Sequence, residues 1–311
     1  MGSVLAVPSV LEGLPRESRV ALLRLRSLGD CVLTTPALAI LKRARPDLRV
    51  AVVVEDRFRA IFEGNPDLDG ILPVRLGALR AWRPRLCVNL HGGTRSAFLT
   101  ALSGARVRAG FGHFRHGAVY NLRIPRAQEI LGVSRKVHTA EHLASAMFYL
   151  GIPLCEIGRA RLVADAGPEP EISGPTAVIH PAAATAEKTW PAPGFLEVAR
   201  HLRRSGIEPV FIGSADDDLT PFQEFRMVRG AALGRIKSLL AAAALFVGND
   251  SGPAHMAAAF GLPVVVLFGA SDPEIWAPWR TASEVIAAPG GIAEVRPEQV
   301  IEALARLRVP A

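Results

Sequence analysis

Short apolar runs alternate with longer helix-like segments along the chain. The runs are four to seven residues long and rich in Val, Ile and Leu, and the clearest occupy residues 20–25, 48–54, 86–90, 176–180 and 245–248. Turn sequences and segments with helical spacing lie between them. Buried strands of this length that alternate with helices are typical of an open parallel sheet. The pattern therefore predicts an α/β protein.

The pattern is interrupted once, by a segment rich in Pro, Gly and Glu at residues 165–175. At 311 residues the chain exceeds the size at which a single hydrophobic core usually divides. We therefore predict two α/β domains, residues 1–165 and 166–311, and a closing helix at 297–307 that could pack back on the first domain. Ligands bind outside the carboxyl ends of the strands in such sheets, so the turns there are the candidate sites.

Charge is distributed unevenly between the two predicted domains. Residues 1–165 contain 24 Lys and Arg against 13 Asp and Glu, a formal charge of +11, whereas residues 166–311 contain 12 against 16. A basic first domain favours an anionic partner such as nucleic acid, a phosphorylated glycan or an anionic membrane surface, although an arginine-rich composition alone explains it equally well. The chain has two tyrosines and no interleaving of basic and aromatic residues, which disfavours nucleic acid.

Several protein classes are excluded or disfavoured. No apolar run reaches the ~20 residues of a transmembrane helix, and residues 1–10 lack the features of a signal peptide. Three widely spaced cysteines suit neither a disulfide framework nor a metal cluster, so we expect reduced thiols and a cytoplasmic location. The histidines show no metal-ligand spacing. The first strand is not followed by Gly-x-Gly-x-x-Gly and no Gly-Lys-Ser/Thr loop occurs, so dehydrogenases and P-loop enzymes are not indicated and no cofactor is expected.

The turn at residues 249–255, Asn-Asp-Ser-Gly-Pro-Ala-His, is the most informative stretch. It follows an apolar run and precedes a helical segment, with Pro253 suited to the first helical position and Gly261 to the position after the last. The free amides of Ser251 and Gly252 at such a helix amino terminus can bind an anion, most often a phosphate. An ordinary capped strand–helix junction can have the same sequence, so this turn alone does not distinguish a ligand site from a structural cap.

Three other turns carry candidate chemistry, and each also has a structural explanation. Gly29 permits a tight turn, and Asp30 beside it is either a helix cap or a carboxylate that accepts a proton from a hydroxyl. Lys188, one of four lysines, is either a solvated loop residue or a point charge for a phosphate. Asp217 follows another strand and either caps the next helix or binds ribose hydroxyls.

Taken in order, four blocks resemble glycosyltransferase family 9, the lipopolysaccharide heptosyltransferases. Arg-Leu-Arg-Ser-Leu-Gly-Asp resembles the amino-terminal signature, Asn-Leu-His-Gly with a later Ser-Ala resembles the second block, Lys-Thr-Trp-Pro the third, and the Asn-Asp-Ser-Gly-Pro-Ala-His turn the carboxyl-terminal signature. The blocks comprise residues 24–30 with 34–38, 89–92 with 95–97, 188–191, and 247–255 with 268–273.

The resemblance implies a GT-B architecture, in which two Rossmann-like domains with parallel sheets face a central cleft. It implies that the second domain binds ADP-L-glycero-D-manno-heptose and that the first binds an anionic glycolipid acceptor, the lipopolysaccharide inner core. The protein could then also bind peripherally to the inner face of the cytoplasmic membrane. The resemblance also implies that the reaction is an inverting displacement that requires no metal.

By position in the matched blocks, Asp30 is the implied general base, and Lys188 with the amides of Ser251 and Gly252 would stabilise the departing ADP. Asp250 orients its turn. We add Gly29 and His91 to the substrate-binding set as members of the first two blocks, and Asp217 as the ribose ligand.

Two features depart from the family pattern. Asn89 stands where the family usually has Asp, and residues 218–234 look too short for the usual helix and strand, which puts Asp217 in doubt. The acceptor-side region 112–137 matches no family feature. Other interpretations stay open: a transferase or an epimerase that uses another nucleotide sugar, or a nucleotide-sugar-binding module without turnover. Dependence of turnover on an acceptor would distinguish a transferase from an epimerase, and retained binding of the ADP-sugar without product would indicate a binding module.

Overall fold

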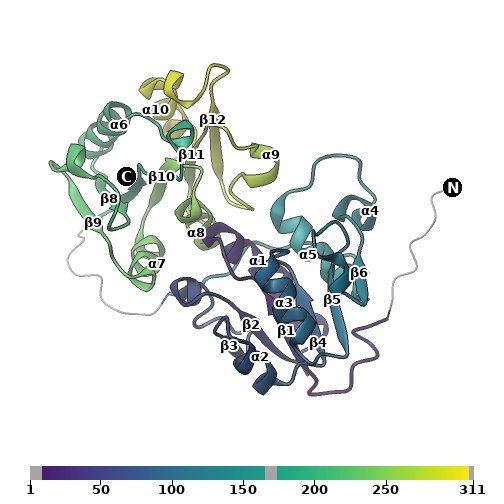
Figure 1. Ribbon diagram of the computed structural model, residues 1–311. Coiled ribbons are helices and arrows are strands. Elements are labelled where there is room, and N and C mark those ends of the chain that lie inside the picture. Colours follow the sequence, from purple (N-terminus) through teal and green to yellow (C-terminus); the bar gives the residue numbers. More distant parts are fainter. Residues whose placement is uncertain (1–8, 165–173, 308–311) are drawn as a thin grey trace. The chain divides into compact units, whose positions relative to one another are not determined.

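The computed structural model describes residues 9–164 and 174–307. Its contacts divide the chain into two compact units, Met1–Gly158 and Arg159–Ala311 (Figure 1). The predicted linker at 165–175 lies almost wholly outside the described residues. Each unit is an α/β layer structure with its own sheet, as the alternation of apolar runs predicts.

In the described residues of the first unit, six parallel strands form one sheet in the order β3-β2-β1-β4-β5-β6. The central strands are apolar on both faces and almost fully buried, as expected of a sheet that is covered on both sides. The strands are β1 (Arg19–Leu23), β2 (Arg49–Val53), β3 (Gly70–Leu72), β4 (Leu86–Asn89), β5 (Val107–Phe111) and β6 (Leu122–Ile124).

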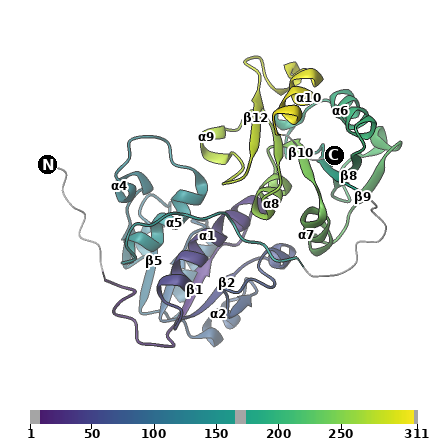
Figure 2. The ribbon, with the colours of Figure 1, turned by 180° about the vertical axis from the view of Figure 1, so that it is seen from behind.

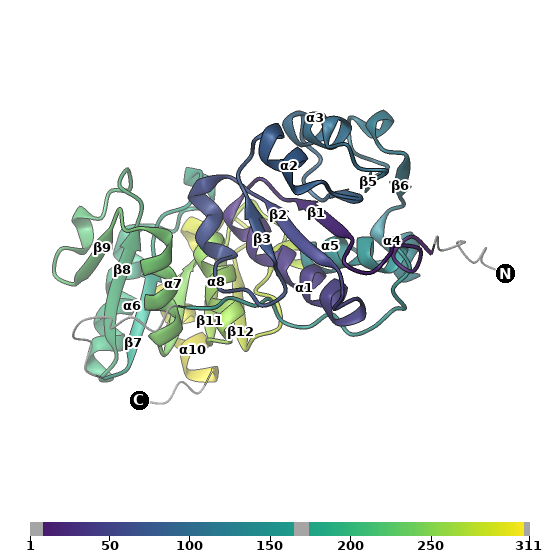
Figure 3. The same cartoon turned by 90° about the horizontal axis from the view of Figure 1, so that it is seen from below.

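Helices cover both faces of this sheet. The chain moves from β1 outward to β2 and β3, then returns to β4 and continues to β5, so right-handed connections place the helices of the two directions on opposite faces. Figure 3 shows α2 and α3 on one side of the sheet and α1 and α5 on the other. The helices are α1 (Leu28–Ala44), α2 (Leu76–Trp82), α3 (Thr94–Leu102), α4 (Ala127–Leu131) and α5 (Thr139–Tyr149), with 3₁₀ turns η1 (Asp56–Ile61) and η2 (Gly117–Val119).

The first helix, α1, continues through an internal proline. Pro36 has no N–H to donate to the carbonyl of Val32, which would leave that carbonyl without its helical partner. The hydroxyl of Thr35 donates to it instead, at 2.8 Å. The helix begins at Leu28, so it includes Asp30 and also Gly29, which was expected in the preceding turn, in its first turn.

The second unit repeats the strand order of the first. Among residues 174–307, six parallel strands lie in the order β12-β11-β10-β7-β8-β9, which read by rank within the unit is again 3-2-1-4-5-6. This is the order of a dinucleotide-binding Rossmann sheet. The strands are β7 (Thr176–His180), β8 (Glu208–Gly213), β9 (Arg226–Arg229), β10 (Leu245–Asn249), β11 (Val264–Phe268) and β12 (Ser283–Ala287).

The helices of the second unit also separate onto two faces. The closing helix α10 packs beside α6, and α7 packs beside α8 (Figure 2). The sequence left open whether the closing helix packs on the first domain. Its apolar residues Val300, Ala303 and Leu304 are buried in the core of its own unit. The helices are α6 (Ala192–Arg204), α7 (Leu233–Ala242), α8 (Gly252–Phe260), α9 (Pro273–Trp276) and α10 (Pro297–Arg306), with turns η3 (Ala186–Lys188), η4 (Thr220–Phe222) and η5 (Ile292–Glu294).

Two regions differ from the sequence-based expectation. Residues 218–234 do contain a strand, β9, and only the expected helix is reduced, to the single 3₁₀ turn η4. Residues 112–137 contain η2, the edge strand β6 and the short helix α4. None of the helices in the described residues has the length and apolar character needed to cross a membrane.

Candidate active site

In the first unit the candidate residues gather where the strand order changes direction. The turn after β1 supplies Ser27 and Asp30, and the turn after the adjacent strand β4 supplies His91. In open parallel sheets this switch point, at the carboxyl ends of the strands, is where ligands bind.

Asp30 is held by two neighbours and remains accessible. Its Oδ2 accepts a hydrogen bond from the hydroxyl of Ser27 at 3.0 Å and faces the Ser27 amide at 3.4 Å, and its Oδ1 lies 3.3 Å from Nη1 of Arg24. The side chain is still 20% exposed. Asp30 therefore closes the first turn of α1 as a cap and also presents a carboxylate to solvent.

The Asp30 carboxylate opens into a hollow of about 500 Å³. Seven residues line it: Arg24, Arg26, Ser27, Asp30, Arg57, Phe58 and His91. Three guanidinium groups around one carboxylate make the hollow suited to an anionic ligand that carries a hydroxyl.

Burial lowers the pKa of two residues that line the hollow. Burial lowers the pKa of the Arg24 guanidinium, and the adjacent Asp30 carboxylate opposes the shift. Burial, followed by the charge of Arg24, lowers the pKa of His91 and so favours its neutral form at pH 7. Gly29, expected in a tight turn, is instead a buried residue within α1 and is absent from the lining of the hollow.

Asn89, the last residue of β4, organises the turn that carries His91. Its Oδ1 accepts hydrogen bonds from the amides of His91 and Gly92 at 3.0 Å each, and its Nδ2 donates to the hydroxyls of Ser96 and Thr100 at 3.1 and 3.2 Å. Both hydroxyls already donate to backbone carbonyls, so they accept here and require a donor at position 89. Asn supplies that donor, which gives the departure from the family pattern a local physical reason.

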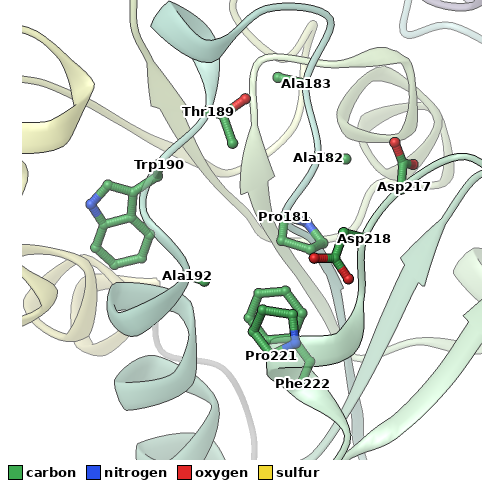
Figure 4. Close-up of a pocket in the computed structure, with 10 residues that line it drawn as sticks. All are labelled: Pro181, Ala182, Ala183, Thr189, Trp190, Ala192, Asp217, Asp218, Pro221 and Phe222. Carbon is green, nitrogen blue, oxygen red and sulfur yellow. The ribbon is translucent and has the colours of Figure 1, made fainter.

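In the second unit a pocket of about 220 Å³ lies at the carboxyl ends of β7 and β8. Figure 4 shows Trp190 from the loop after β7 and Ala192 from the start of α6 on one side and Asp217 and Asp218 from the loop after β8 on the other. Its volume is below the roughly 300–1,000 Å³ typical of small-molecule sites, so it suits one part of a larger ligand. Of the candidates in this unit, Asp217 alone lines it; its Oδ2 also accepts a hydrogen bond from the Ser214 amide at 2.6 Å.

Lys188 and Asp250 form a pair outside the lining of this pocket. Nζ of Lys188 lies 3.6 Å from Oδ2 of Asp250, and the two side chains are 32% and 11% exposed. The pair joins the loop after β7 to the turn after β10, adjacent strands that form the switch point of the second sheet.

The turn after β10 leads directly into α8, as predicted. The helix begins at Gly252, so Pro253 is its second residue rather than its first. Within the described residues, the amides of Ser251 and Gly252 donate no hydrogen bond to the protein. Both remain available at the positive end of the helix, as an anion site requires.

His180, which the sequence did not single out, holds the Ser251 side chain. Nδ1 of His180 lies 3.0 Å from Oγ of Ser251. Burial lowers the pKa of His180 to about 4, and a smaller effect of Asp217 opposes the shift. The imidazole is therefore neutral at pH 7 and adds no charge to the site.

Buried contacts fix the loop that carries Lys188. The amide of Trp190 donates to Oδ1 of Asn249 at 3.1 Å, and Nδ2 of Asn249 donates to the Pro181 carbonyl at 2.8 Å. The Trp190 indole donates to the Val295 carbonyl at 2.9 Å, inside the core. A Cβ at Gly269, the residue after β11, would collide with the carbonyl oxygen of Glu187, so this loop lies directly against Gly269.

Sequence reasoning missed six residues that line the first hollow or hold Ser251, namely Arg24, Arg26, Ser27, Arg57, Phe58 and His180. Arg24 lies in a matched block and directly precedes the Asp30 turn, a signal that could have identified it. His180 ends an apolar strand, where a polar residue at the carboxyl end is itself a signal. No group of three or more His, Cys, Asp or Glu side chains in the described residues is arranged to hold a metal ion.

Two Rossmann-like units in one chain, each with candidate binding residues at its switch point, define a protein of the GT-B class. The model of glycosyltransferase family 9 (heptosyltransferase) matches residues 78–302. The chain therefore belongs to glycosyltransferase family 9 and is a glycosyltransferase.

The relatives agree with this assignment. Lipopolysaccharide heptosyltransferase 3 of Escherichia coli K12 is 27% identical over 292 residues, which cover 82% of this chain and 83% of the relative. Lipopolysaccharide heptosyltransferase 1 of Pseudomonas aeruginosa is 28% identical over 295 residues, which cover 82% of this chain and 79% of the relative.

Solved structures share the fold. A family 9 glycosyl transferase from Veillonella parvula superimposes with a TM-score of 0.81 at 22% identity, covering 94% of this chain and 97% of that one. The E. coli heptosyltransferase WaaC, solved with ADP, gives a TM-score of 0.77 at 19% identity, covering 93% and 99%.

Proposed function

We propose that this glycosyltransferase moves a heptose from ADP-L-glycero-D-manno-heptose to the inner core of lipopolysaccharide, with inversion and without a metal ion. The observation that carries the proposal is the Asp30 carboxylate, which opens into an arginine-lined hollow at the switch point of a family 9 chain. The names of the similar lipopolysaccharide heptosyltransferases support the choice of donor and acceptor.

The acceptor binds in the hollow of the first unit. Arg26 and Arg57 face this space and can pair with acidic groups of a phosphorylated inner core, while Arg24 and Ser27 hold the two oxygens of Asp30. Asp30 then accepts the proton of the attacking hydroxyl as the general base.

The donor binds in the second unit. The pocket beside Trp190 takes the nucleoside, with Asp217 placed for the ribose hydroxyls. Lys188 and the amides of Ser251 and Gly252 bind the diphosphate, and Asp250 orients Lys188.

The reaction is a single displacement. The acceptor oxygen forms a bond to the anomeric carbon on the face opposite the diphosphate, its proton passes to Asp30, and the bond to the phosphate oxygen breaks with both electrons leaving on ADP. The charge that develops on ADP is stabilised by the ammonium of Lys188 and by the helix amides, which supply positive charge without a metal ion.

The test is the release of ADP from ADP-heptose, measured in EDTA with and without Kdo-lipid A. Acceptor-dependent release, lost in Asp30→Asn, supports a metal-independent heptosyltransferase. Turnover without acceptor would favour an epimerase or a hydrolase. Donor binding without turnover would mean another acceptor or a binding module, and absence of donor binding would overturn the choice of sugar nucleotide.

The basic first domain and the lipid acceptor lead us to propose a cytoplasmic protein that acts at the inner face of the cytoplasmic membrane.

Binding of an anionic acceptor in the arginine-lined hollow should also make the kinetics depend on ionic strength. Rising ionic strength should raise the KM for the acceptor more than the KM for the donor, because screening weakens exposed charge pairs over distances of about 10 Å at 0.1 M salt. Equal effects on both would contradict the assignment of the acceptor to this hollow.

A further inference from the structure

One long segment of the first unit carries many positive charges and no negative ones. Residues 70–128 contain ten arginines and not a single Asp, Glu or Lys. This segment begins at β3 and ends in α4, so it includes α2, α3, β4, β5 and β6. A folded domain normally mixes both signs on its surface, so this separation needs a reason.

The arginines of this segment differ from those around it in how they are paired. In the rest of the first unit, at least seven of the twelve basic side chains form ion pairs with nearby acids: Arg24, Lys42, Arg45, Arg49, Arg57, Arg59 and Arg135. Among the described residues, none of the ten guanidinium groups in 70–128 lies within 4 Å of an acidic side chain; only the backbone amide of Arg126 contacts one, that of Glu129. Their charge is therefore left for a partner outside the chain.

Four of these arginines stand exposed on α2 and α3, which form one face of the first sheet (Figure 3). Arg80 of α2 donates to the Leu102 carbonyl of α3, and Arg95 of α3 donates to the Val74 carbonyl beside α2, so the two helices share one basic layer. We call this surface the α2–α3 face and define it by Arg75, Arg80, Arg83, Arg95 and Phe98.

Helix stability does not account for Arg75 and Arg95. Arg75 is the N-cap of α2 and Arg95 lies in the first turn of α3, where a cation opposes the positive end of the helix dipole.

A large apolar side chain projects from the same face. Phe98 is 59% exposed, one turn along α3 from Arg95, and the outward positions around it are Thr94, Arg95 and Ala101. An exposed phenylalanine among unpaired arginines matches the two components of peripheral membrane binding, apolar insertion and attraction to anionic headgroups.

We infer that the α2–α3 face docks the enzyme on an anionic phospholipid bilayer, with Phe98 inserted among the headgroups. The charge complementarity carries the choice of partner: unpaired guanidinium groups suit a sheet of lipid phosphates. A nucleic acid would need a stacking surface, and Phe98 is the one large aromatic that stands more than a third exposed among the described residues. The inference rests on surface charge and exposure and needs neither donor nor acceptor.

Co-sedimentation of the full chain with lipid vesicles tests it. The protein should bind vesicles of about 30% phosphatidylglycerol in phosphatidylcholine at about 0.1 M salt, and should not bind pure phosphatidylcholine. An Arg75→Gln/Arg83→Asn variant should bind about 25-fold more weakly, since each arginine near an anionic leaflet contributes about fivefold. Asn suits position 83, whose φ is 52°.

The matched control removes the same charge elsewhere. Arg16→Gln/Arg204→Gln replaces two exposed arginines outside the face and should bind as the parent does. Phe98→Ser should weaken vesicle binding at least about fivefold with an unchanged salt dependence.

If both double variants lost vesicle binding equally, binding would depend only on net charge, and the assignment of the α2–α3 face would be wrong. Tighter binding to a duplex oligonucleotide than to the vesicles would overturn the choice of partner. The Arg75→Gln/Arg83→Asn variant should turn over a delipidated acceptor normally, so a failure of docking leaves the proposed reaction intact, and a failure of the reaction leaves docking measurable.

Discussion

The ammonium of Lys188 lies 3.6 Å from the carboxylate of Asp250, across the switch point of the second sheet. Both residues are on turns fixed by buried hydrogen bonds through Asn249. The pair holds a partly exposed cation beside the turn that leads into α8, where we propose that the diphosphate binds.

Replacing Lys188 tests whether this cation binds the donor. Lys188→Ala should raise the KM for ADP-heptose about 10- to 100-fold, the worth of a charge-assisted hydrogen bond, and should lower kcat because charge on the leaving group is no longer stabilised. Steady-state kinetics at varied donor concentration measures both. Lys188→Arg keeps the charge and should lose less. Donor kinetics unchanged in Lys188→Ala would remove the residue from the site.

Asp30 should act on turnover rather than on donor binding. Asp30→Asn removes the proton acceptor and should lower kcat by about 10²- to 10⁴-fold while ADP-heptose affinity stays within a few-fold. Ser27→Ala removes a hydrogen bond to the same carboxylate and provides the control. It should cost about 1 kcal/mol of stability and leave most of the activity. If Asp30→Asn retains most of its turnover, Asp30 is only a cap.

Asn89→Asp should destabilise the first unit although it restores the residue type common in the family. The hydroxyls of Ser96 and Thr100 already donate to carbonyls and would face a buried carboxylate without a donor. We expect a loss of about 1–3 kcal/mol in the free energy of unfolding, measured by urea titration. Asn89→Asp combined with Ser96→Ala and Thr100→Ala leaves the carboxylate buried and should not recover the loss. An unchanged unfolding midpoint in the single variant would contradict this account.

Stability should depend on pH through one partly buried histidine in each unit. His142 stacks on Phe111 with ring centroids 4.0 Å apart, and burial, followed by nearby His113 and Arg24, lowers its pKa to about 4; His180 in the second unit is lowered similarly. Unfolded histidine titrates near 6.5, so between pH 6.5 and 4 the unfolded state binds the extra proton. Stability should therefore be constant above pH 6.5 and fall below it, by roughly 2–3 kcal/mol for each histidine at pH 4.

Single variants assign this pH dependence. His142→Phe should flatten the pH dependence of unfolding of the first unit alone, and His180→Gln that of the second alone. Urea unfolding at several pH values between 7.5 and 4.5, followed by tryptophan fluorescence and circular dichroism, resolves the two contributions. Parallel slopes in parent and variants would show that other groups carry the pH dependence.

The apolar periodicity was sufficient to predict the two parallel sheets. The central strands are continuous buried runs, so their positions in the chain and their type could be predicted directly. The turns after β1, β4, β7 and β10 were candidate sites because ligands bind at the carboxyl ends of parallel strands. The strand order was not readable from periodicity, because it depends on which strands pair and not on their composition.

Side-chain pairing was the main limit on predicting the site. The sequence shows Asp30 and Lys188 but not that Arg24 and Asp250 lie against them, since those contacts depend on the geometry of buried turns. His180 was missed because its role depends on Ser251, which is 71 residues later and meets it across adjacent strands. The prediction of Gly29 in a tight turn was wrong because α1 already begins at Leu28, directly after its N-cap Ser27.

Replacement of Gly269 should affect the activity of the protein in the cell and not its amount. The Glu187 carbonyl occupies the space where any side chain at position 269 would begin, and Glu187 lies in the exposed part of its loop, three residues before the buried anchor Trp190. A missense allele at this codon should therefore yield a protein that accumulates at its normal cellular level but in which Lys188 is displaced from its position beside Asp250. Such an allele would be silent in an abundance assay and visible only in the glycan that the cell displays.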